Sequence, residues 1–296
     1  MLENSPHPGE LWSGRIVPKR DDEWKNQKEY ILYLRHLKAY DFALRYVKEK
    51  SVLDVGCGSG YGIAFLSNFS SYAIGIDISE ETIRYCKKRY KRKNLEFKHV
   101  ESNWIKKGLP FEECSFDVCV SFQVIEHIHP KNVEGYLSAI SEILKEEGLF
   151  IVSTPNSRLR LLPFQKPWNR FHMKEYDHEE LGNLLWGMFS KVEVYGLYAT
   201  KRAYMIEYEL MKQSPLKVYI VHPSYRMLKS LTGLPPFIII FLENVNAKRR
   251  ISKRNKEFIR KDDSFVDLFS LKDFKVVNST EKDLGSCLDL ICVCHK

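Results

Sequence analysis

The stretch VLDVGCGSGYG, residues 52–62, constrains the fold more than any other part of the chain. Val52, Leu53 and Val55 are typical of a buried strand, four glycines then break it, and IAFLSNF continues with helical spacing. A strand, a glycine turn and a helix form the first half of a nucleotide-binding βαβ unit. Glycine lets the backbone approach a ligand where a Cβ would clash. The stretch therefore predicts a nucleotide-like ligand.

Strand and helix patterns alternate along the rest of the chain. Further strands are expected at YAIGIDIS (72–79), LEFKHV (95–100), FDVCVSF (116–122), LFIVST (149–154), KVEVYGLYA (191–199) and LDLICVCHK (288–296). Strands that alternate with helices form a parallel sheet covered on both faces. We expect an α/β fold with a doubly wound, mostly parallel, seven-stranded Rossmann-like sheet.

The chain divides into three parts by pattern. Residues 1–50 predict a helical N-terminal cap, and residues 51–199 with 286–296 predict the cofactor-binding core. Residues 200–285, rich in aromatic and charged side chains, predict an insertion before the last strand that covers the substrate.

The net charge of +8 over 296 residues comes mainly from KRRISKRNKEFIRK, residues 248–261. A solvated surface is the plainest interpretation, and an anionic substrate, membrane surface or nucleic acid are the alternatives. No RNA-binding motif accompanies the segment, so we do not expect a nucleic acid partner. Together with the apolar run at 237–242, it predicts peripheral membrane contact through residues 237–261. No pattern predicts the oligomeric state.

The cysteines and the N-terminus bear on the compartment. Seven cysteines without a CxxC pair predict reduced thiols. The first fifteen residues hold no apolar signal core, and FIIIFL at 237–242 is too short to span a bilayer. We expect a soluble cytoplasmic protein.

Acidic residues separate two classes of ligand. A dinucleotide turn would place its third glycine where Tyr61 stands, whereas this chain has Asp54 followed by Gly56, Gly58 and Gly60. Asp77 ends the second strand, where a carboxylate accepts hydrogen bonds from ribose hydroxyls. Asp54 lies where it can meet an ammonium group, which a dinucleotide lacks.

Four segments, VLDVGCGSGYG, GIDIS, FDVCVSFQVIEHIHP and LKEEGLFIVSTPN, together resemble the class I S-adenosylmethionine-dependent methyltransferases, in the group with the ubiquinone O-methyltransferases. The resemblance implies that Asp54, Gly56, Gly58 and Gly60 bind the methionine part of S-adenosylmethionine. It further implies that Asp77 holds the ribose, that Glu101 meets the adenine amine, and that Phe122 and Gln123 lie near the sulfonium, with Ile78 as a further cofactor-binding residue.

The outer segments GELWSGRIVP, RHLKAYDFALRYVKEK and NRFHMKEYDHEELGNLL are similar to a branch associated with glycosyltransferases and surface-polysaccharide assembly. The chain departs from that branch at Arg35, Ala39 and Arg170. The similarity implies O-methylation of a sugar or a glycan-linked small molecule. Alternatives are a lipid or quinone O-methyltransferase at a membrane surface, an RNA methyltransferase, and a non-catalytic cofactor-binding protein.

A hydroxyl acceptor needs a group that removes its proton. His127 and Glu126 follow the fourth strand and His172 follows the fifth, at the edge where open sheets bind ligands. We predict these three as catalytic residues, with His36 as a further candidate. Some members of the family that the chain resembles have a carboxylate at the position of Gln123 and hold a cation with the residue at Glu126; this chain has a neutral amide there, so we expect no metal.

Overall fold

The computed structural model describes residues 17–18, 24, 26–162, 165–167, 169–211 and 265–296. Five parallel strands form its first half: β1 (Ser51–Val55), β2 (Tyr72–Asp77), β3 (Leu95–His99), β4 (Phe116–Phe122) and β5 (Leu144–Pro155). Strand order runs outward from β1, to β2 and β3 on one side and to β4 and β5 on the other. The order reverses between β1 and β4, which is where open α/β sheets bind their ligands.

Three strands from the later chain extend the sheet beyond β5: β6 (Lys191–Ala199), β7 (Phe274–Asn278) and β8 (Asp289–His295). β8 lies between β5 and β6 and is antiparallel to both, and β7 pairs with β6 at the edge. The expected fold class is confirmed, but the described sheet has eight strands and not seven. The missed strand, FKVVN, is a short edge strand whose pattern is too brief to be distinguished from a loop.

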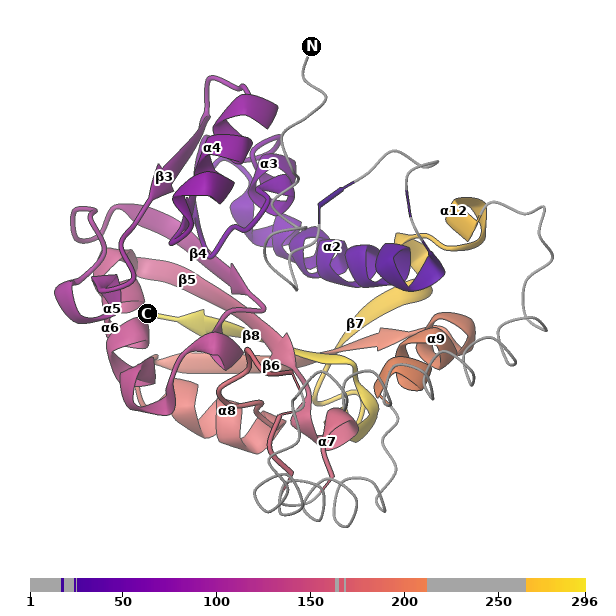
Figure 1. Cartoon of the computed structure of the whole chain (residues 1–296). Coiled ribbons are helices and arrows are strands. Elements are labelled where there is room, and N and C mark those ends of the chain that lie inside the picture. Colours follow the sequence, from indigo (N-terminus) through magenta and orange to yellow (C-terminus); the bar gives the residue numbers. More distant parts are fainter. Residues whose placement is uncertain (1–16, 19–23, 25, 163–164, 168, 212–264) are drawn as a thin grey trace, which may run out of the picture.

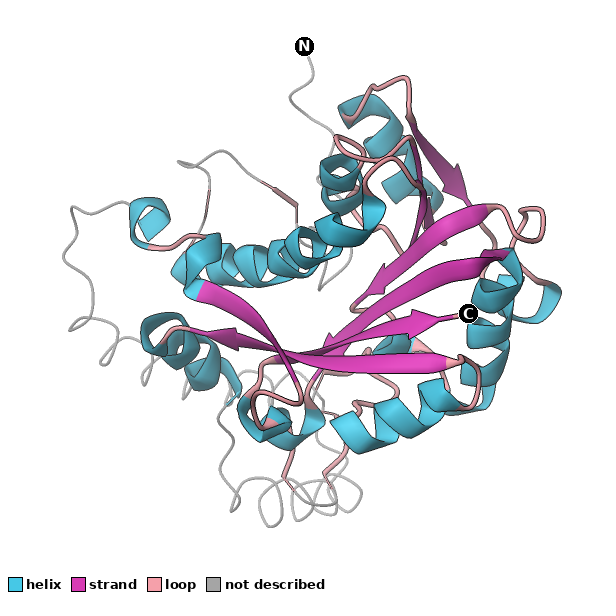
Figure 2. Ribbon diagram, turned by 180° about the vertical axis from the view of Figure 1, so that it is seen from behind, coloured by secondary structure: helices cyan, strands magenta, loops and turns pink. Residues whose placement is uncertain are grey.

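Helices cover both faces of the sheet (Figure 1; Figure 2). One face carries α2 (Gln27–Val47), α3 (Tyr61–Leu66) and α4 (Glu80–Arg89), and the other carries α5 (Trp104–Lys107), α6 (Val133–Ile143) and α8 (His178–Trp186). Two apolar cores result, and Val52 and Leu53 of β1 belong to different ones because successive strand residues point to opposite faces. Ser79 is the N-cap of α4, and its side-chain hydroxyl accepts a hydrogen bond from the backbone amide of Thr82.

Short elements shape the loops. They are α7 (Ser157–Arg160), α9 (Lys201–Met211), α12 (Phe265–Leu268), η2 (Ile125–His127), η3 (Pro130–Asn132), η5 (Leu271–Asp273) and η6 (Leu284–Ser286). Within the described ranges, no helix has the length and apolarity needed to cross a membrane. The predicted membrane-contacting segment 237–261 lies outside the described residues, and the division into three parts stays a prediction.

Candidate active site

The glycine turn after β1 lies at the carboxyl edge of the sheet. The φ angles of Gly56, Gly58 and Gly60 are +79°, +53° and +77°, a region that favours glycine. An added Cβ would lie 2.6 Å from Val124 Cγ2 at Gly56 and 2.8 Å from Cys86 Sγ at Gly60. At Gly58 it would meet no atom of the described residues within 4 Å. Packing therefore requires Gly56 and Gly60 to be small, whereas Gly58 borders open space.

Asp77, at the end of β2, is held by two backbone amides. Gly58 N donates to its Oδ2 at 3.1 Å, and Ser79 N donates to its Oδ1 at 2.8 Å. These bonds connect the glycine turn to β2 and fix the direction of a buried carboxylate. A carboxylate oxygen accepts more than one hydrogen bond, so ribose hydroxyls can still bind there. Ile78 follows with 56% of its surface exposed, which leaves an apolar face beside that position.

Asp54, in β1, is buried and only half satisfied. Tyr40 Oη donates to its Oδ2 at 3.0 Å, while its Oδ1 has no hydrogen-bond partner within the described part of the chain. Burial raises the pKa of Asp54 to about 7, and the charge of Asp77 adds to the rise while the Tyr40 bond opposes it. A buried acceptor without a donor is costly, so a bound ammonium group would stabilise it.

Tyr40 is a site residue that the sequence analysis missed. It reaches Asp54 from α2 because Gly62 leaves room: a Cβ on Gly62 would lie 1.9 Å from Tyr40 Cζ. The Tyr40 ring also packs edge-on against Phe122, with centroids 4.8 Å apart. Gly62 could have indicated this contact from the sequence. It lies after the turn that faces the ligand, so a different neighbour must require it to be small.

The residues after β4 and β3 complete the cofactor side. Phe122 is buried at the end of β4, and Gln123 has a φ of +59°, strained for a residue with a side chain. Gln123 N donates to Ser153 O at 2.9 Å, which holds this turn against β5. Glu101 is an exposed residue that follows β3, and its Oε2 accepts a hydrogen bond from the side-chain amide nitrogen of Asn103 at 3.5 Å. These positions fit the predicted roles, which remain predictions.

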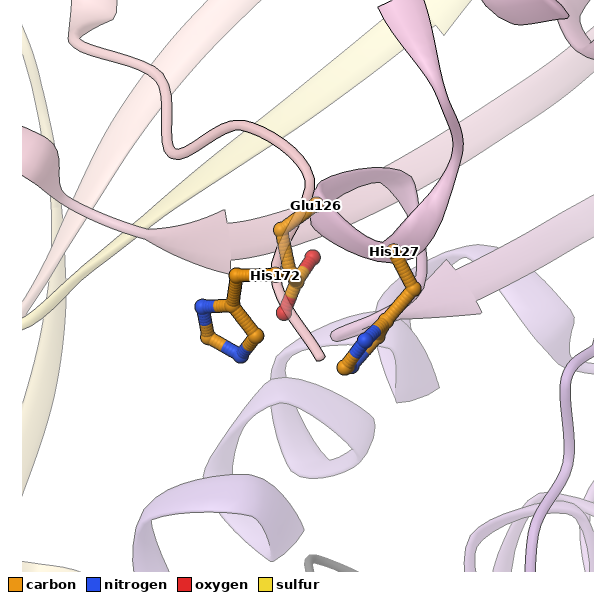
Figure 3. A group of neighbouring side chains, drawn as sticks. All are labelled: Glu126, His127 and His172. Atoms are coloured by element: carbon orange, nitrogen blue, oxygen red, sulfur yellow. The ribbon is translucent and has the colours of Figure 1, made fainter. Parts of the chain in front are cut away.

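The three predicted catalytic residues lie together. Glu126 and His127 are in η2, and His172 belongs to the loop between α7 and α8. One ligand-type atom from each of the three lies within 4.8 Å of the others, and Figure 3 shows the Glu126 carboxyl group between the two imidazoles. The imidazole rings pack edge-on with centroids 4.8 Å apart. Two segments more than forty residues apart therefore form one cluster.

Hydrogen bonds orient every member of this cluster. His127 Nδ1 lies 2.9 Å from the carbonyl of Phe171, and His172 Nδ1 lies 2.7 Å from Glu175 Oε1. Glu126 Oε2 accepts from Thr154 Oγ1 at 3.0 Å. Burial raises the pKa of Glu126 to about 7, and partial burial lowers the pKa of His127. The pKa of Glu175 is lowered because His172 and Arg160 outweigh its burial.

A second buried ionic group borders the cluster and was also missed. Arg35 of α2 binds Glu207 of α9 at 2.9 Å and Asp289 of β8 at 3.1 Å, and all three are almost fully buried. Glu207 Oε1 and Asp289 Oδ1 have no hydrogen-bond donor among the described residues. Burial raises the pKa of both carboxyls. Because these residues are dispersed through the chain, no motif could have revealed the group.

His36, the further candidate, lies on α2 next to Arg35 in sequence. Burial and the charge of Arg35 lower its pKa to about 3, so its imidazole is neutral. It is not a member of the cluster formed by Glu126, His127 and His172.

Residues 53–152 match the family model described as a methyltransferase domain. The chain carries a class I methyltransferase domain. The matched residues contain the glycine turn, Asp54, Asp77 and the Glu126–His127 segment, and S-adenosylmethionine is the methyl donor of this class. The domain fits that cofactor in two respects: among the described residues, a buried carboxylate oxygen of Asp54 lacks a donor, and Gly58 borders open space.

Curated relatives of the methyltransferase domain support the assignment. A protein of Mycolicibacterium smegmatis named a probable S-adenosylmethionine-dependent methyltransferase is 33% identical over 159 residues, 53% of this chain and 58% of that protein. A fatty-acid O-methyltransferase of the same organism is 28% identical over 144 residues, 48% of each chain. The chain thus spans less than two thirds of the length of these relatives.

Among solved structures, the methyltransferase domain and its flanks are similar to a SAM-dependent methyltransferase from Archaeoglobus fulgidus. The TM-score is 0.48 at 17% identity, with 93% of this chain and 97% of that chain covered.

Proposed function

We propose that this protein transfers a methyl group from S-adenosylmethionine to a hydroxyl of a small-molecule acceptor. The observation that carries the proposal is Asp54 Oδ1, which has no hydrogen-bond partner among the described residues and belongs, with the open space at Gly58, to the matched methyltransferase domain. An ammonium group placed there would donate to Asp54 Oδ1 the charge-assisted hydrogen bond that no described residue supplies.

The neighbouring residues bind the remaining parts of the cofactor. Asp77 holds the ribose hydroxyls with Ile78 beside it, Glu101 contacts the adenine amine, and Phe122 and Gln123 lie near the reacting methyl group. When bound, S-adenosylmethionine supplies a methyl group already activated on a positively charged sulfur. The protein's task is therefore to align the acceptor oxygen with that methyl carbon and to exclude water.

The cluster of Glu126, His127 and His172 activates the acceptor hydroxyl. His127 donates from Nδ1 to the Phe171 carbonyl, so its Nε2 carries a lone pair and can accept the hydroxyl proton. The new O–C bond forms as the S–C bond breaks, and the electron pair of the broken bond stays on sulfur. Glu126 and His172 orient the base and contact the acceptor.

Two features support a sugar or glycan-linked acceptor. The outer segments resemble a glycan-associated branch, and Glu207 Oε1 and Asp289 Oδ1, which have no donor within the described part of the chain, need hydrogen-bond donors. Sugar hydroxyls are such donors, whereas an acyl chain is not. Asp289 begins β8 and pairs with Pro155, so it lies at the same edge of the sheet as the cluster.

A lipid acceptor is the second candidate. It is favoured by the relative named a fatty-acid O-methyltransferase, and a quinone acceptor belongs to the same alternative. The third candidate is not an enzyme but a protein that binds the cofactor without transferring its methyl group. The methyl-transfer experiment described below tests it as well.

Calorimetry with S-adenosylmethionine, S-adenosylhomocysteine and NAD tests the proposal. We expect the first two to bind and Asp77→Ala to weaken them at least about 100-fold, since two charge-assisted bonds and the support of the turn are lost. Glu96→Ala, which removes an exposed carboxylate from β3, is the matched control and should bind normally. Binding of NAD alone, or of none of the three, would overturn the proposal.

Transfer of labelled methyl groups then separates the acceptors. Incorporation into nucleotide sugars or glycolipid headgroups supports the first candidate, and incorporation into fatty acids or quinones supports the second. Cofactor binding without transfer to any class, unchanged in His127→Ala, would indicate the non-catalytic protein.

A further inference from the structure

We propose that Glu126, His127 and His172 form a binding site for one divalent transition-metal ion. The three side chains offer one carboxylate oxygen and two imidazole nitrogens within 4.8 Å of one another. Among the described residues, no other group of three or more His, Cys, Asp or Glu side chains brings its ligand atoms so close together. The proposal departs from the expectation drawn from Gln123, because a histidine from a distant loop supplies the third ligand.

Each imidazole is oriented as a metal ligand requires. The Phe171 carbonyl only accepts hydrogen bonds, so His127 carries its proton on Nδ1. Glu175 is held as a carboxylate by Arg160 at 3.0 Å, so His172 likewise donates from Nδ1. The lone pair of each ring is therefore on Nε2. Carboxylates and carbonyls that hold the second ring nitrogen are the usual outer partners of metal-bound histidine.

The cluster is held in place before any ion binds. Met173 N and Lys174 N both donate to the carbonyl of Glu126, at 2.7 and 3.3 Å, and so fasten the His172 loop to η2. Glu126 is fixed by Thr154, while His127 is exposed and gives an ion access from solvent. Ligands at about 2.1 Å from a tetrahedral ion lie about 3.4 Å apart, so small side-chain rotations close the site.

The donor set selects the class of ion. Two neutral imidazoles and one carboxylate suit Zn²⁺, Co²⁺ or Ni²⁺, whereas Mg²⁺ and Ca²⁺ prefer oxygen ligands. Three protein ligands leave a coordination position open, as in catalytic zinc sites. If the proposed function holds, on which this role rests, the ion binds the acceptor hydroxyl there and lowers its pKa, and the proton leaves to water. The histidines then act as ligands in place of a base.

Titration of the chelator-treated full chain with Zn²⁺, and with Co²⁺ as an absorbing probe, tests the site. We expect one ion per chain, and His127→Ala to weaken binding at least about 100-fold without altering the thermal unfolding curve, because that ring is exposed. His172→Ala should weaken binding similarly. Glu175→Gln, an outer partner, should weaken it about 10-fold or more. His129→Ala, an exposed histidine two residues away, is the matched control.

Absence of stoichiometric binding, or equal affinity in wild type and His127→Ala, would overturn the metal site. Calorimetry with S-adenosylmethionine on the same metal-free protein keeps the two proposals separate. Cofactor binding without metal binding removes this inference alone, and metal binding without cofactor binding removes the proposed function alone.

Discussion

The carboxyl edge of the sheet has two sides that are built differently. On the side that we propose for the cofactor, the groups after β1 and β2 come from one stretch, residues 54–79, and two backbone amides hold Asp77. On the other side, after β4 and β5, the groups come from α2, η2, the loop before α8, α9 and β8. In our proposal, a cofactor common to a whole class is bound by a compact local motif, and the acceptor side is assembled from segments far apart in the chain.

The two sides also differ in how they hold charge. The acceptor side buries four carboxyl groups, Glu126, Glu175, Glu207 and Asp289, against two guanidinium groups, Arg35 and Arg160. Buried ions remain only when they are paired, so each member depends on the others. The cofactor side depends instead on small residues and fixed backbone. The cofactor side should therefore be sensitive to added volume, and the acceptor side to lost charge.

The largest effect is expected from Arg35→Met. Removal of this guanidinium leaves Glu207 and Asp289 buried without a cation, and we expect a loss of about 3–5 kcal/mol in the free energy of unfolding at pH 7.5. Urea unfolding measures it. The double variant Arg35→Met with Glu207→Leu should recover part of the loss, because an apolar pair tolerates burial. If Arg35→Met alone lowers the free energy of unfolding by less than about 1 kcal/mol, the acceptor side does not depend on its buried charges as we infer.

The cofactor side is tested by two neighbouring glycines. Gly62→Ala places a methyl group against Tyr40 and should destabilise the fold by about 1–3 kcal/mol. Gly58→Ala meets open space and should cost only the left-handed backbone, about 1–2 kcal/mol, yet weaken S-adenosylmethionine more than Gly62→Ala does. Unfolding curves and calorimetry on both variants decide it. If Gly58→Ala binds S-adenosylmethionine with normal affinity, the cofactor does not occupy the open space at Gly58.

The smallest effect concerns pH. Because the pKa of Asp54 is raised to about 7, its carboxylate becomes more populated as pH rises, and only the carboxylate attracts an ammonium group. Affinity for S-adenosylmethionine should therefore tighten about eightfold from pH 6 to 7.5, in proportion to the ionised fraction. Calorimetry across this range measures it. Asp54→Asn should bind more weakly and show a flat profile, and a persisting slope would assign the effect to another group.

Local patterns were sufficient for much of the fold. Neighbouring residues are enough to indicate the alternation of strands and helices, the glycine turn and the cap at Ser79. The structure confirms the fold class. The edge strand β7 was missed because five residues carry little periodic signal, and its pairing with β6 comes from packing. His127 and His172 could be named as candidates since each follows a strand, but nothing in the sequence predicted that their rings would touch.

The parts whose physics is local can be predicted from the sequence alone: backbone conformation at the glycines, the faces of each strand, and the acids near the ends of β1 and β2. Only the tertiary structure decided which distant groups meet. Tyr40 reaches Asp54 across the space left by Gly62, and Arg35 pairs with residues more than 170 positions away. The reason is energetic, because buried charges and hydrogen bonds are stabilised only by partners that the completed packing brings within reach.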